Sequence, residues 1–436
     1  MNIKKISSIT SLYKKKYINF LHKHDIFWIL SLYGTAIGAG VLFLPINIGI
    51  NGFLPLIFIT LLSFPIVFFS HRGLTRFVLS SSKPNNNIIQ AAEEYFGFIS
   101  SNLITFLYFF SIYSILLVYG ISITNNVEHF IVQLLGYYSP PRWLLSLFLI
   151  GSIISIVTLG EKYIIKKISI LGFFFIIILV LFSIYMIPYW HVAAVKSLVF
   201  SEIYLYNSNN NQSIIITVCF IIPAIVFTFN HSPIISTFVI ANRKKYGDFS
   251  DKKTSKILFL AHMLMVLTVI FFVFSCMFTL SPVDFLKAKS DNISVLDYLS
   301  LYFDKPFIRY ASSFIAFIAI IKSFLGHYLG AREGCNALIK KIYQLQGKKI
   351  NHKRINIITI IFMLTTIWLV STLNPNILNI IENLVGPMIA FLLFIMPIYA
   401  IKKTSVMNKY SGHFSNFFVL LIGIISILSA VYKLFL

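Results

Sequence analysis

The chain has 436 residues, of which 58% are hydrophobic and only 11% are charged, and its mean hydropathy is +0.84. This composition excludes a soluble globular protein and is typical of a chain that crosses a lipid bilayer many times. The net charge of +22 does not indicate a nucleic-acid partner, because the Lys and Arg residues lie in short segments between apolar stretches. The three cysteines show no CxxC spacing, so we expect neither a zinc site nor a disulfide framework.

Eleven apolar segments are predicted to cross the membrane, at about 20 residues per crossing. They cover residues 26–47, 52–70, 101–123, 143–160, 168–188, 213–240, 256–280, 310–330, 356–373, 377–401 and 415–436. The first is not a cleaved signal peptide, because it follows a basic leader and ends without a small-residue cleavage site. The expected class is therefore an all-α integral membrane protein with eleven transmembrane helices.

The distribution of basic residues predicts the orientation of these helices. Six segments on one predicted side carry 28 of the 36 Lys and Arg residues, namely residues 1–25, 71–100, 161–167, 241–256, 331–355 and 401–414. The positive-inside rule places this side in the cytoplasm, so we expect a cytoplasmic basic amino terminus and, after eleven crossings, a periplasmic carboxyl terminus. Attraction to anionic lipid is then sufficient to explain the positive charge.

Lys322 lies in the middle of an otherwise apolar predicted helix. A charge at the bilayer centre costs roughly 2.5–3.5 kcal/mol on an insertion scale, so such a residue is a candidate for function. An alternative is a permanently charged lysine that caps backbone carbonyl groups where a neighbouring helix is broken.

The first predicted span contains three glycines within seven residues, Gly34, Gly38 and Gly40. This favours local unwinding, and unwound backbone in a membrane must bind something or line a cavity. Close helix packing through the GxxxG pair Gly34 and Gly38 is the alternative. The spacing fits neither a phosphate-binding loop nor a dinucleotide fingerprint.

The sixth predicted span carries a polar group of residues, Asn230, His231 and Ser232, between Pro223 and Pro233. Proline kinks a helix, so we expect a second break here. A satisfied core histidine is the alternative interpretation of His231.

The two expected breaks lie in spans one and six, which run in opposite directions. This arrangement is typical of an inverted five-plus-five repeat whose broken helices meet at the midplane and form the binding site. The repeats are predicted at residues 26–188 and 213–401, with the eleventh helix at 415–436. Helix ends and free carbonyl groups suit a zwitterion, so an amino acid is the expected substrate.

The sequence resembles the hydroxy/aromatic amino acid permease family from about Asp25 to the carboxyl terminus. The runs that carry this resemblance are Gly34–Pro45, Phe69–Ser80, Phe227–Ser236, Lys322–Gly334 and Asn374–Ile401. Among its members, Asn230-His231-Ser232-Pro233 is more similar to those that carry serine than to those that carry threonine. The resemblance implies a leucine-transporter type of fold, a bacterial inner membrane location, and coupling to protons without another cofactor.

Roles for individual residues follow from this combination. We expect Gly38, Ala39 and Gly40 to hold the substrate carboxylate, with Thr35 and Ala36 near the ammonium group. The predicted sixth span contributes Phe227 and Phe229, which shape the pocket, and Asn230, His231 and Ser232, which read a side-chain hydroxyl. The candidates for proton coupling are Lys322, Ser323, His327 and Glu382. An ammonium group at Lys322 can replace a coupling cation with its own charge and then lose that charge by deprotonation.

Other functional classes fit less well. No HExxH, GxSxG or paired-carboxylate pattern indicates a membrane enzyme, and no GxxxxGK[ST] motif indicates an ATP-driven pump. A channel and a substrate sensor with a transporter fold fit the same pattern. Within transporters, a sodium-coupled carrier and a threonine or aromatic amino acid carrier are the alternatives to a proton-coupled serine importer. The oligomeric state is not predicted.

Overall fold

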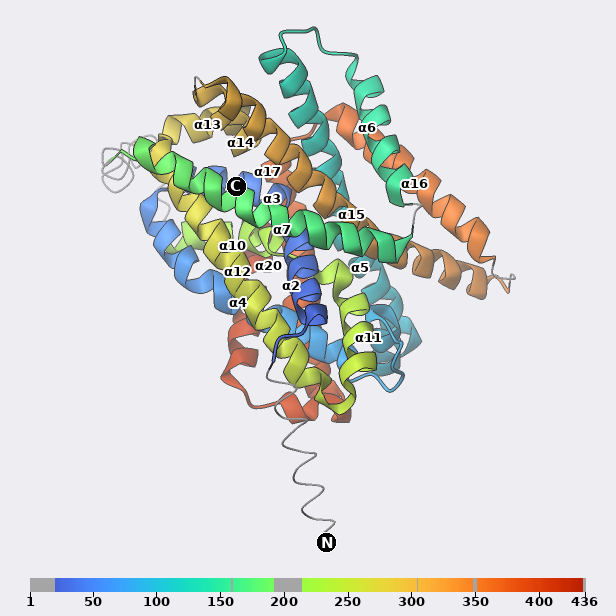
Figure 1. Cartoon of the computed structure of the whole chain (residues 1–436). Coiled ribbons are helices and arrows are strands. Elements are labelled where there is room, and N and C mark those ends of the chain that lie inside the picture. Colours follow the sequence, from blue (N-terminus) through green and yellow to red (C-terminus); the bar gives the residue numbers. More distant parts are fainter. Residues whose placement is uncertain (1–19, 158–159, 192–213, 304, 348–350, 434–436) are drawn as a thin grey trace.

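The computed structural model describes residues 20–157, 160–191, 214–303, 305–347 and 351–433, and every secondary-structure element within them is a helix (Figure 1). The predictions made for residues 1–19 and 192–213 concern residues outside these ranges. The α-helices are α2 (Lys23–Ala36), α3 (Ala39–Asn51), α4 (Phe53–Leu79), α5 (Ile88–His129), α6 (Arg142–Val157), α7 (Glu161–Met186), α10 (Ile214–Thr228), α11 (Ile235–Tyr246), α12 (Ser250–Thr279), α13 (Pro282–Ser290), α14 (Val295–Tyr302), α15 (Pro306–Leu345), α16 (His352–Leu373), α17 (Ile377–Ile380), α18 (Gly386–Ala390), α19 (Met396–Lys403) and α20 (Phe414–Lys433).

Each of the eleven predicted segments overlaps one or more of these helices. By length and apolar character, the described residues contain eight candidate spans, or nine when the bent pair α2–α3 is one span. Two features account for the smaller number: α6 has only 16 residues, and residues 216–279, which contain α10, α11 and α12, form one continuous candidate.

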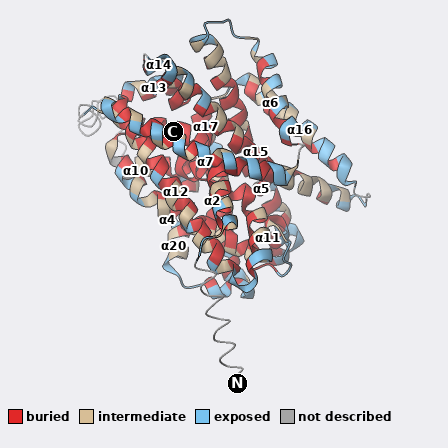
Figure 2. Cartoon of the chain, in the orientation of Figure 1, coloured by how far each residue is buried: buried red, intermediate tan, exposed pale blue. Residues whose placement is uncertain are grey.

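Burial separates inner from outer helices. Figure 2 shows buried residues concentrated in α2, α5, α12 and α15, whereas α6 and α16 present long exposed stripes. The exposed stripes are apolar, with Phe148 and Phe362 among their residues. An exposed apolar face is the surface expected against lipid rather than water. The inner helices therefore form the centre of the molecule, and the first of the two breaks described next directly follows one of them, α2.

The first break separates α2 from α3, which are bent by 55°. Ile37 has extended backbone angles and Gly38 has φ −145° and ψ −136°, so the helix is interrupted for two residues. Gly34 lies before the break and packs against α7, because an added Cβ would lie 2.6 Å from the carbonyl oxygen of Ile168. Both interpretations of the glycine-rich run therefore apply: Gly34 allows close helix packing, and Gly38 lies where the helix is interrupted.

The second break follows Thr228, where α10 ends, and continues to a short 3₁₀ turn at Ser232–Ile234 that leads into α11. The predicted break is present, but Pro223 does not mark it. Pro223 lies inside α10, and it packs against Gly386 of α18, where an added Cβ would lie 2.4 Å away. Pro223 instead lies at a close contact between α10 and α18, two helices that are far apart in the sequence.

The predicted basic segments gather on one side of the molecule. Asp25 pairs with Lys253, and Arg76 pairs with Asp251 and lies 4.5 Å from the centre of the Tyr410 ring. These contacts join the segments 1–25, 71–100, 241–256 and 401–414. We call this the basic side, and it lies at the lower end of Figure 1 near α11 and the start of α12.

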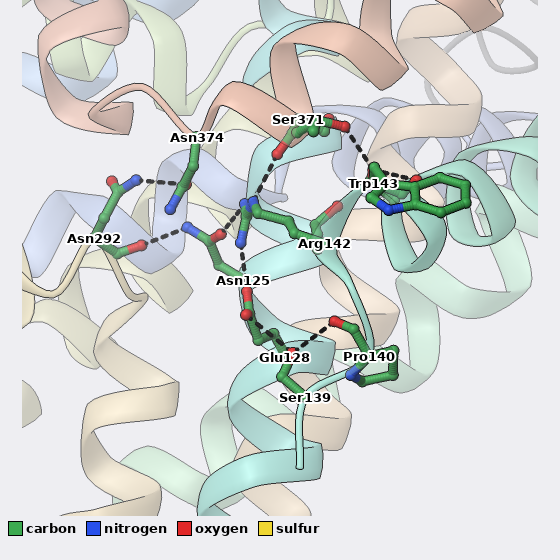
Figure 3. A network of polar contacts seen from close by, with 12 residues as sticks. Asn125, Glu128, Ser139, Pro140, Arg142, Trp143, Asn292, Ser371 and Asn374 are labelled. Atoms are coloured by element: carbon green, nitrogen blue, oxygen red, sulfur yellow. Dashed lines mark hydrogen bonds and ion pairs between the residues drawn. The ribbon is translucent and has the colours of Figure 1, made fainter.

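The opposite side carries a network of polar contacts centred on Arg142, at the start of α6 (Figure 3). Its guanidinium group donates to the carbonyl oxygen of Ser371 at 2.9 Å, to the side chain of Asn125, and to Glu128, with which it forms an ion pair. Asn125 in turn donates to the carbonyl oxygen of Asn292 at 2.8 Å. The network thus ties the ends of α5, α6 and α16 to the turn between α13 and α14.

Candidate functional site

The two breaks contact each other through the glycines of α3. A Cβ added to Gly40 would lie 2.5 Å from the Cα atom of Thr228, the last residue of α10. A Cβ added to Gly38 would lie 2.4 Å from the Ser323 hydroxyl oxygen and 3.1 Å from that of Tyr119. Only glycine permits these approaches, so the broken first span lies directly against both α10 and α15.

Lys322 lies at the end of α2, where the break frees carbonyl groups. Its ammonium group donates to the carbonyl oxygens of Gly34, at 3.2 Å, and Ile37. The Ser323 hydroxyl donates to the same two oxygens, at 3.3 and 2.9 Å. Lys322 is fully buried, and its ammonium group lies 4.4 Å from the centre of the Phe175 ring. A positive charge on this side chain therefore occupies the place that a cation with oxygen ligands would take.

His327 lies one turn further along α15. Its Nδ1 atom is 2.9 Å from the carbonyl oxygen of Ser323, and its ring makes an edge contact with Tyr119 at 5.2 Å. Its Nε2 atom is buried and has no hydrogen-bond partner among the described residues. Tyr119 also faces the Phe227 ring, at 6.4 Å between centres. Together these side chains surround the start of α3.

The other predicted substrate-binding residues are buried, and some of their polar groups are already used in hydrogen bonds within the protein. The Thr35 hydroxyl donates to the carbonyl oxygen of Ser31 at 2.9 Å, so it is used within α2. The side-chain oxygen of Asn230 accepts from the backbone N–H of Ser232 at 3.2 Å, whereas its amide nitrogen has no partner within the described parts of the chain. Ala36, Ala39 and Phe229 offer only backbone polar groups.

His231 points to a different neighbour from the one predicted. Its ring stacks on that of His71 in α4, with centres 3.8 Å apart and planes 10° apart. His262 of α12 completes the group, with its ring centre 4.9 Å from that of His231 and 5.3 Å from that of His71. All three are buried, and one ring nitrogen of each lies within 4.8 Å of the others.

This group has the composition of a metal site but not its geometry. A metal ion lies close to the plane of each imidazole that binds it, at about 2.0–2.1 Å from the nitrogen for zinc. Because the His71 and His231 rings are stacked with an interplanar angle of 10°, no point within bonding distance of both rings lies in both ring planes. We therefore do not assign a metal to these residues.

Glu382 is separated from the other coupling candidates in its contacts. It lies in a π-helical segment, Ile381–Val385, and its carboxylate accepts from the amide of Asn47 near the end of α3. This contact links the first span to the tenth on the side of the molecule where α3 ends. A link between two spans suits a gate, so Glu382 is a candidate gate residue as well as a candidate for proton coupling.

A cavity of about 510 Å³ opens among residues of the basic side. Its lining includes Glu161 and Glu333, and residues from the segments 71–100 and 331–355. Its lining also includes Pro233 and Leu329. Pro233 follows Ser232 in the second break, and Leu329 is two residues after His327. The cavity therefore leads from the basic side toward the broken helices.

Sequence reasoning did not select Tyr119, His71 or His262 for function. The signal for His262 was present, because it is an ionisable residue inside a predicted apolar span, as Lys322 is, whereas His71 directly follows the predicted span 52–70. Tyr119 gave no such signal, since it is one of 23 tyrosines in a chain rich in aromatic residues.

Comparisons with known proteins agree with this architecture. The serine transporter SdaC of Escherichia coli strain K12 is 52% identical over 413 residues, which cover 95% of each chain. SdaC of Shigella flexneri is equally similar. Among solved structures, the fold is similar to that of MhsT in complex with L-phenylalanine, with a TM-score of 0.59, 16% identity, and coverage of 93% of this chain and 98% of MhsT.

A manganese transporter of Eremococcus coleocola also has a similar fold, with a TM-score of 0.56, 11% identity, and coverage of 94% of this chain and 85% of the transporter. These two likenesses show that the chain shares the leucine-transporter type of fold with these structures. The model of the tryptophan/tyrosine permease family matches residues 24–431, which confirms the resemblance found in the sequence. The chain therefore belongs to the tryptophan/tyrosine permease family.

Proposed function

We propose that this protein imports L-serine across the bacterial inner membrane by symport with protons. The observation that supports this substrate best is the 52% identity to the serine transporter SdaC over nearly the whole of both chains. The meeting of the two broken helices, where Gly40 packs against Thr228, supports a site for an amino acid between them.

The backbone of α3 is proposed to bind the substrate carboxylate. The first N–H groups of a helix have no partner within it, and the helix dipole favours negative charge there. In α3 these groups belong to Ala39 and Gly40, next to the break at Gly38. The carbonyl groups at the end of α2, around Thr35 and Ala36, are proposed to accept from the substrate ammonium group.

The second break is proposed to read the serine hydroxyl. Asn230 has a buried amide nitrogen without a described partner, and it lies between Phe229 and the polar residues His231 and Ser232. A site that bonds a hydroxyl rejects an analogue without one far more strongly than an apolar pocket does. Phe227, which packs on Gly40, is proposed to shape the pocket.

Lys322 is proposed to take the place of a coupling cation. Its contacts with the carbonyl oxygens of Gly34 and Ile37, shared with Ser323, are those that a bound cation would make. His327 is proposed to assist proton movement from the next turn of α15. Glu382, through Asn47, is proposed to act as a gate on the side away from the cavity.

The topology is proposed to be eleven crossings with a cytoplasmic amino terminus. The contacts among the basic segments support their location on one side, and the positive-inside rule makes that side cytoplasmic. Residues 26–188 and 213–401 then form the two inverted repeats, and 415–436 the added eleventh helix. The cavity on the basic side would face the cytoplasm.

Uptake of radiolabelled serine into proteoliposomes, with proton and sodium gradients imposed separately, tests this proposal. We expect serine to accumulate with the proton gradient alone and to be displaced by unlabelled serine more effectively than by threonine, phenylalanine or tryptophan. Gly40→Val is the matched control, because its branched side chain would collide with Thr228 and block the carboxylate site.

Other outcomes of this experiment would support one of the alternative functions. Accumulation with the sodium gradient alone would identify a sodium-coupled carrier, and stronger displacement by threonine or an aromatic amino acid would change the substrate. Equilibration without accumulation under either gradient would contradict symport and indicate a channel-like or facilitated pathway.

A further inference from the structure

His71, His231 and His262 bring three separate elements together at the second break. His71 lies in the middle of α4, His231 within the break itself, and His262 in the middle of α12. His71 is 2% exposed, and the other two are fully buried. Three buried imidazoles within 5.3 Å of one another need a reason, because each loses its contacts with water. We name them the histidine cluster.

The hydrogen bonds of the cluster define where protons already lie. His71 Nδ1 is 2.9 Å from the carbonyl oxygen of Val67, so it must carry a proton to make that bond. His71 Nε2 then has a lone pair, and it accepts from the backbone N–H of His231 at 3.4 Å. His231 Nδ1 likewise donates to the carbonyl oxygen of Phe229 at 3.0 Å, which leaves its Nε2 as a lone pair.

The remaining ring nitrogens are open to a further proton. His231 Nε2 has no hydrogen-bond partner within the ranges that the structure describes, and His262, whose ring lies against the backbone of Leu258, keeps at least one ring nitrogen without a partner there. A proton bound to one ring can be shared only with a ring inclined to it, because an imidazole lone pair lies in the ring plane, and the His262 ring is inclined by 42° to that of His231 and by 44° to that of His71. A second proton is opposed by repulsion between two buried imidazolium ions. The cluster is therefore arranged for one proton rather than for a metal ion.

Ionisable and aromatic side chains surround the histidine cluster. His327 of α15 lies within electrostatic reach of His231, and Lys322 lies within reach of His327. Arg72 follows His71 in α4, but its guanidinium group packs over the rings of Phe68 and Phe69. Phe68 also covers the edge of His262. The ionisable groups that act on the cluster are thus other histidines, and a positive charge on any one of them opposes a second proton on the cluster.

One hydrogen bond links the charge of the cluster to the shape of the break. The bond from the His231 backbone N–H to His71 exists only while His71 Nε2 is unprotonated. If that nitrogen gains a proton, two N–H groups face each other and the backbone at His231 must move away. The neighbouring Asn230 and Ser232 belong to the proposed substrate site, so the movement reaches the substrate.

We infer that the histidine cluster receives the transported proton and that its protonation changes the second break. This inference rests on the proposed proton-coupled transport of an amino acid and adds a site to it. The proton enters from the aqueous phase on one side of the membrane, binds one ring nitrogen, and leaves to the phase on the other side. The cluster itself undergoes no net change over the cycle.

Glutamine replacements test the inference, because a glutamine amide keeps hydrogen-bonding groups but does not titrate. We expect full-length His71→Gln and His262→Gln in proteoliposomes to lose proton-driven serine accumulation. Exchange of internal for external serine at equal pH should continue within about threefold of the unmodified rate, since exchange does not require net proton movement. Thr75→Val, one turn from His71 and also buried, is the control and should accumulate serine normally.

A second measurement separates protonation from a structural role. In the unmodified protein the apparent KM for serine exchange should change about fivefold or more between about pH 5.5 and pH 7.5, as expected for coupled binding. In both glutamine variants the KM should be independent of pH over this range. A variant that only distorts the fold would raise the KM and keep its pH dependence.

Three results would overturn the inference. The first is normal accumulation by both variants, and the second is a KM that keeps its pH dependence in both. The third is stoichiometric binding of Zn²⁺ to the unmodified protein that His262→Gln abolishes, which would make the cluster a metal site. Failure of the unmodified protein to accumulate serine would instead contradict the proposed function, so the two failures are distinguishable.

Discussion

The basic side and the opposite side of the molecule are held together by different kinds of contact. On the basic side, Asp25 and Lys253 form an ion pair at 2.7 Å, and both side chains are 0% exposed. On the opposite side, the Arg142 and Glu128 side chains are 18% and 31% exposed, and they share a wider set of amides and carbonyl groups (Figure 3). The cavity lies among residues of the segments 71–100 and 331–355, with Glu161 and Thr237 also in its lining.

This difference indicates how each side can move. A buried ion pair is specific, and separating it leaves a charge without compensation, so it fixes α2 against α12 until the whole contact changes. A partly exposed network can exchange its bonds for water at little cost. The Arg142 network thus holds its side by several modest contacts, whereas the basic side has one strong contact between α2 and α12.

The largest expected effect lies between the two sides, at Lys322. Lys322→Gln should abolish accumulation of serine, because an amide donates to the carbonyl oxygens of Gly34 and Ile37 but carries no charge. Lys322→Arg should also fail, since a guanidinium group does not deprotonate at any working pH and is larger than the buried site. Accumulation and equilibrium binding of labelled serine, measured side by side, check this prediction.

Comparison of Lys322→Gln with Lys322→Arg tests whether Lys322 carries the transported proton. Binding should survive Lys322→Gln within about tenfold, since the expected loss belongs to coupling rather than to recognition. Accumulation by the arginine variant would show that Lys322 is a fixed charge throughout the cycle. Ser323→Ala is the matched neighbour, and its loss of one shared hydrogen bond should reduce transport only partly.

Much of the fold was predictable because membrane helices follow simple rules. Apolar length located helices for all eleven segments, and Gly38 marked the first break because backbone there must approach Ser323. The sequence did not reveal that α6 is short or that the tenth segment contains two π-helical parts, Ile381–Val385 and Phe391–Ile395. Such local changes depend on neighbouring helices rather than on composition.

The candidate site was predicted in its parts but not in its arrangement. Lys322 was conspicuous as a charge in an apolar segment, and the structure supplies its partners, the carbonyl groups of α2. His231 was selected with Asn230 and Ser232, yet its ring faces His71. Spacing along one helix does not indicate which residues from α4 and α12 will pack against it, so the histidine cluster required the structure.

On the basic side, Asp25→Asn should cause the largest loss of stability. The buried Lys253 ammonium would keep the Phe20 carbonyl oxygen, 2.7 Å away, but lose its counter-charge. Removing one partner of a buried pair typically costs about 3–5 kcal/mol. Thermal unfolding of purified protein in detergent measures the change. Asp251→Asn is the control, because its partly exposed pair with Arg76 should contribute less than about 1 kcal/mol.

The double variant Asp25→Leu/Lys253→Met tests the cause of that loss. It removes both charges, and it should be more stable than Asp25→Asn, since apolar residues of similar size often replace a buried pair well. If the double variant is as unstable as the single one, packing at α2 rather than charge is responsible.

On the opposite side, Arg142→Lys should have a smaller effect. The guanidinium group reaches Ser371, Asn125 and Glu128 at once, whereas a lysine ammonium lacks the planar fork needed to keep all three. The expected loss is about 1–2 kcal/mol, the contribution of one or two hydrogen bonds. Arg309→Lys provides the comparison, because Arg309 makes a single long contact, 3.5 Å from the Gln133 carbonyl oxygen. Equal losses of stability for Arg142→Lys and Arg309→Lys would show that the network around Arg142 adds no more stability than a single contact.

The smallest effect is expected for Glu128→Gln, which keeps the shape of the Arg142 network and removes one charge. The ion pair is partly exposed, so its loss should change stability by less than about 1 kcal/mol. The Ser139 hydroxyl, 3.1 Å from Glu128, still finds an amide oxygen to donate to. The difference from the unmodified protein should also shrink at roughly 0.5 M salt, because exposed charges are screened. A loss as large as that of Asp25→Asn would show that this pair is effectively buried, and that the two sides of the molecule are held by the same kind of contact.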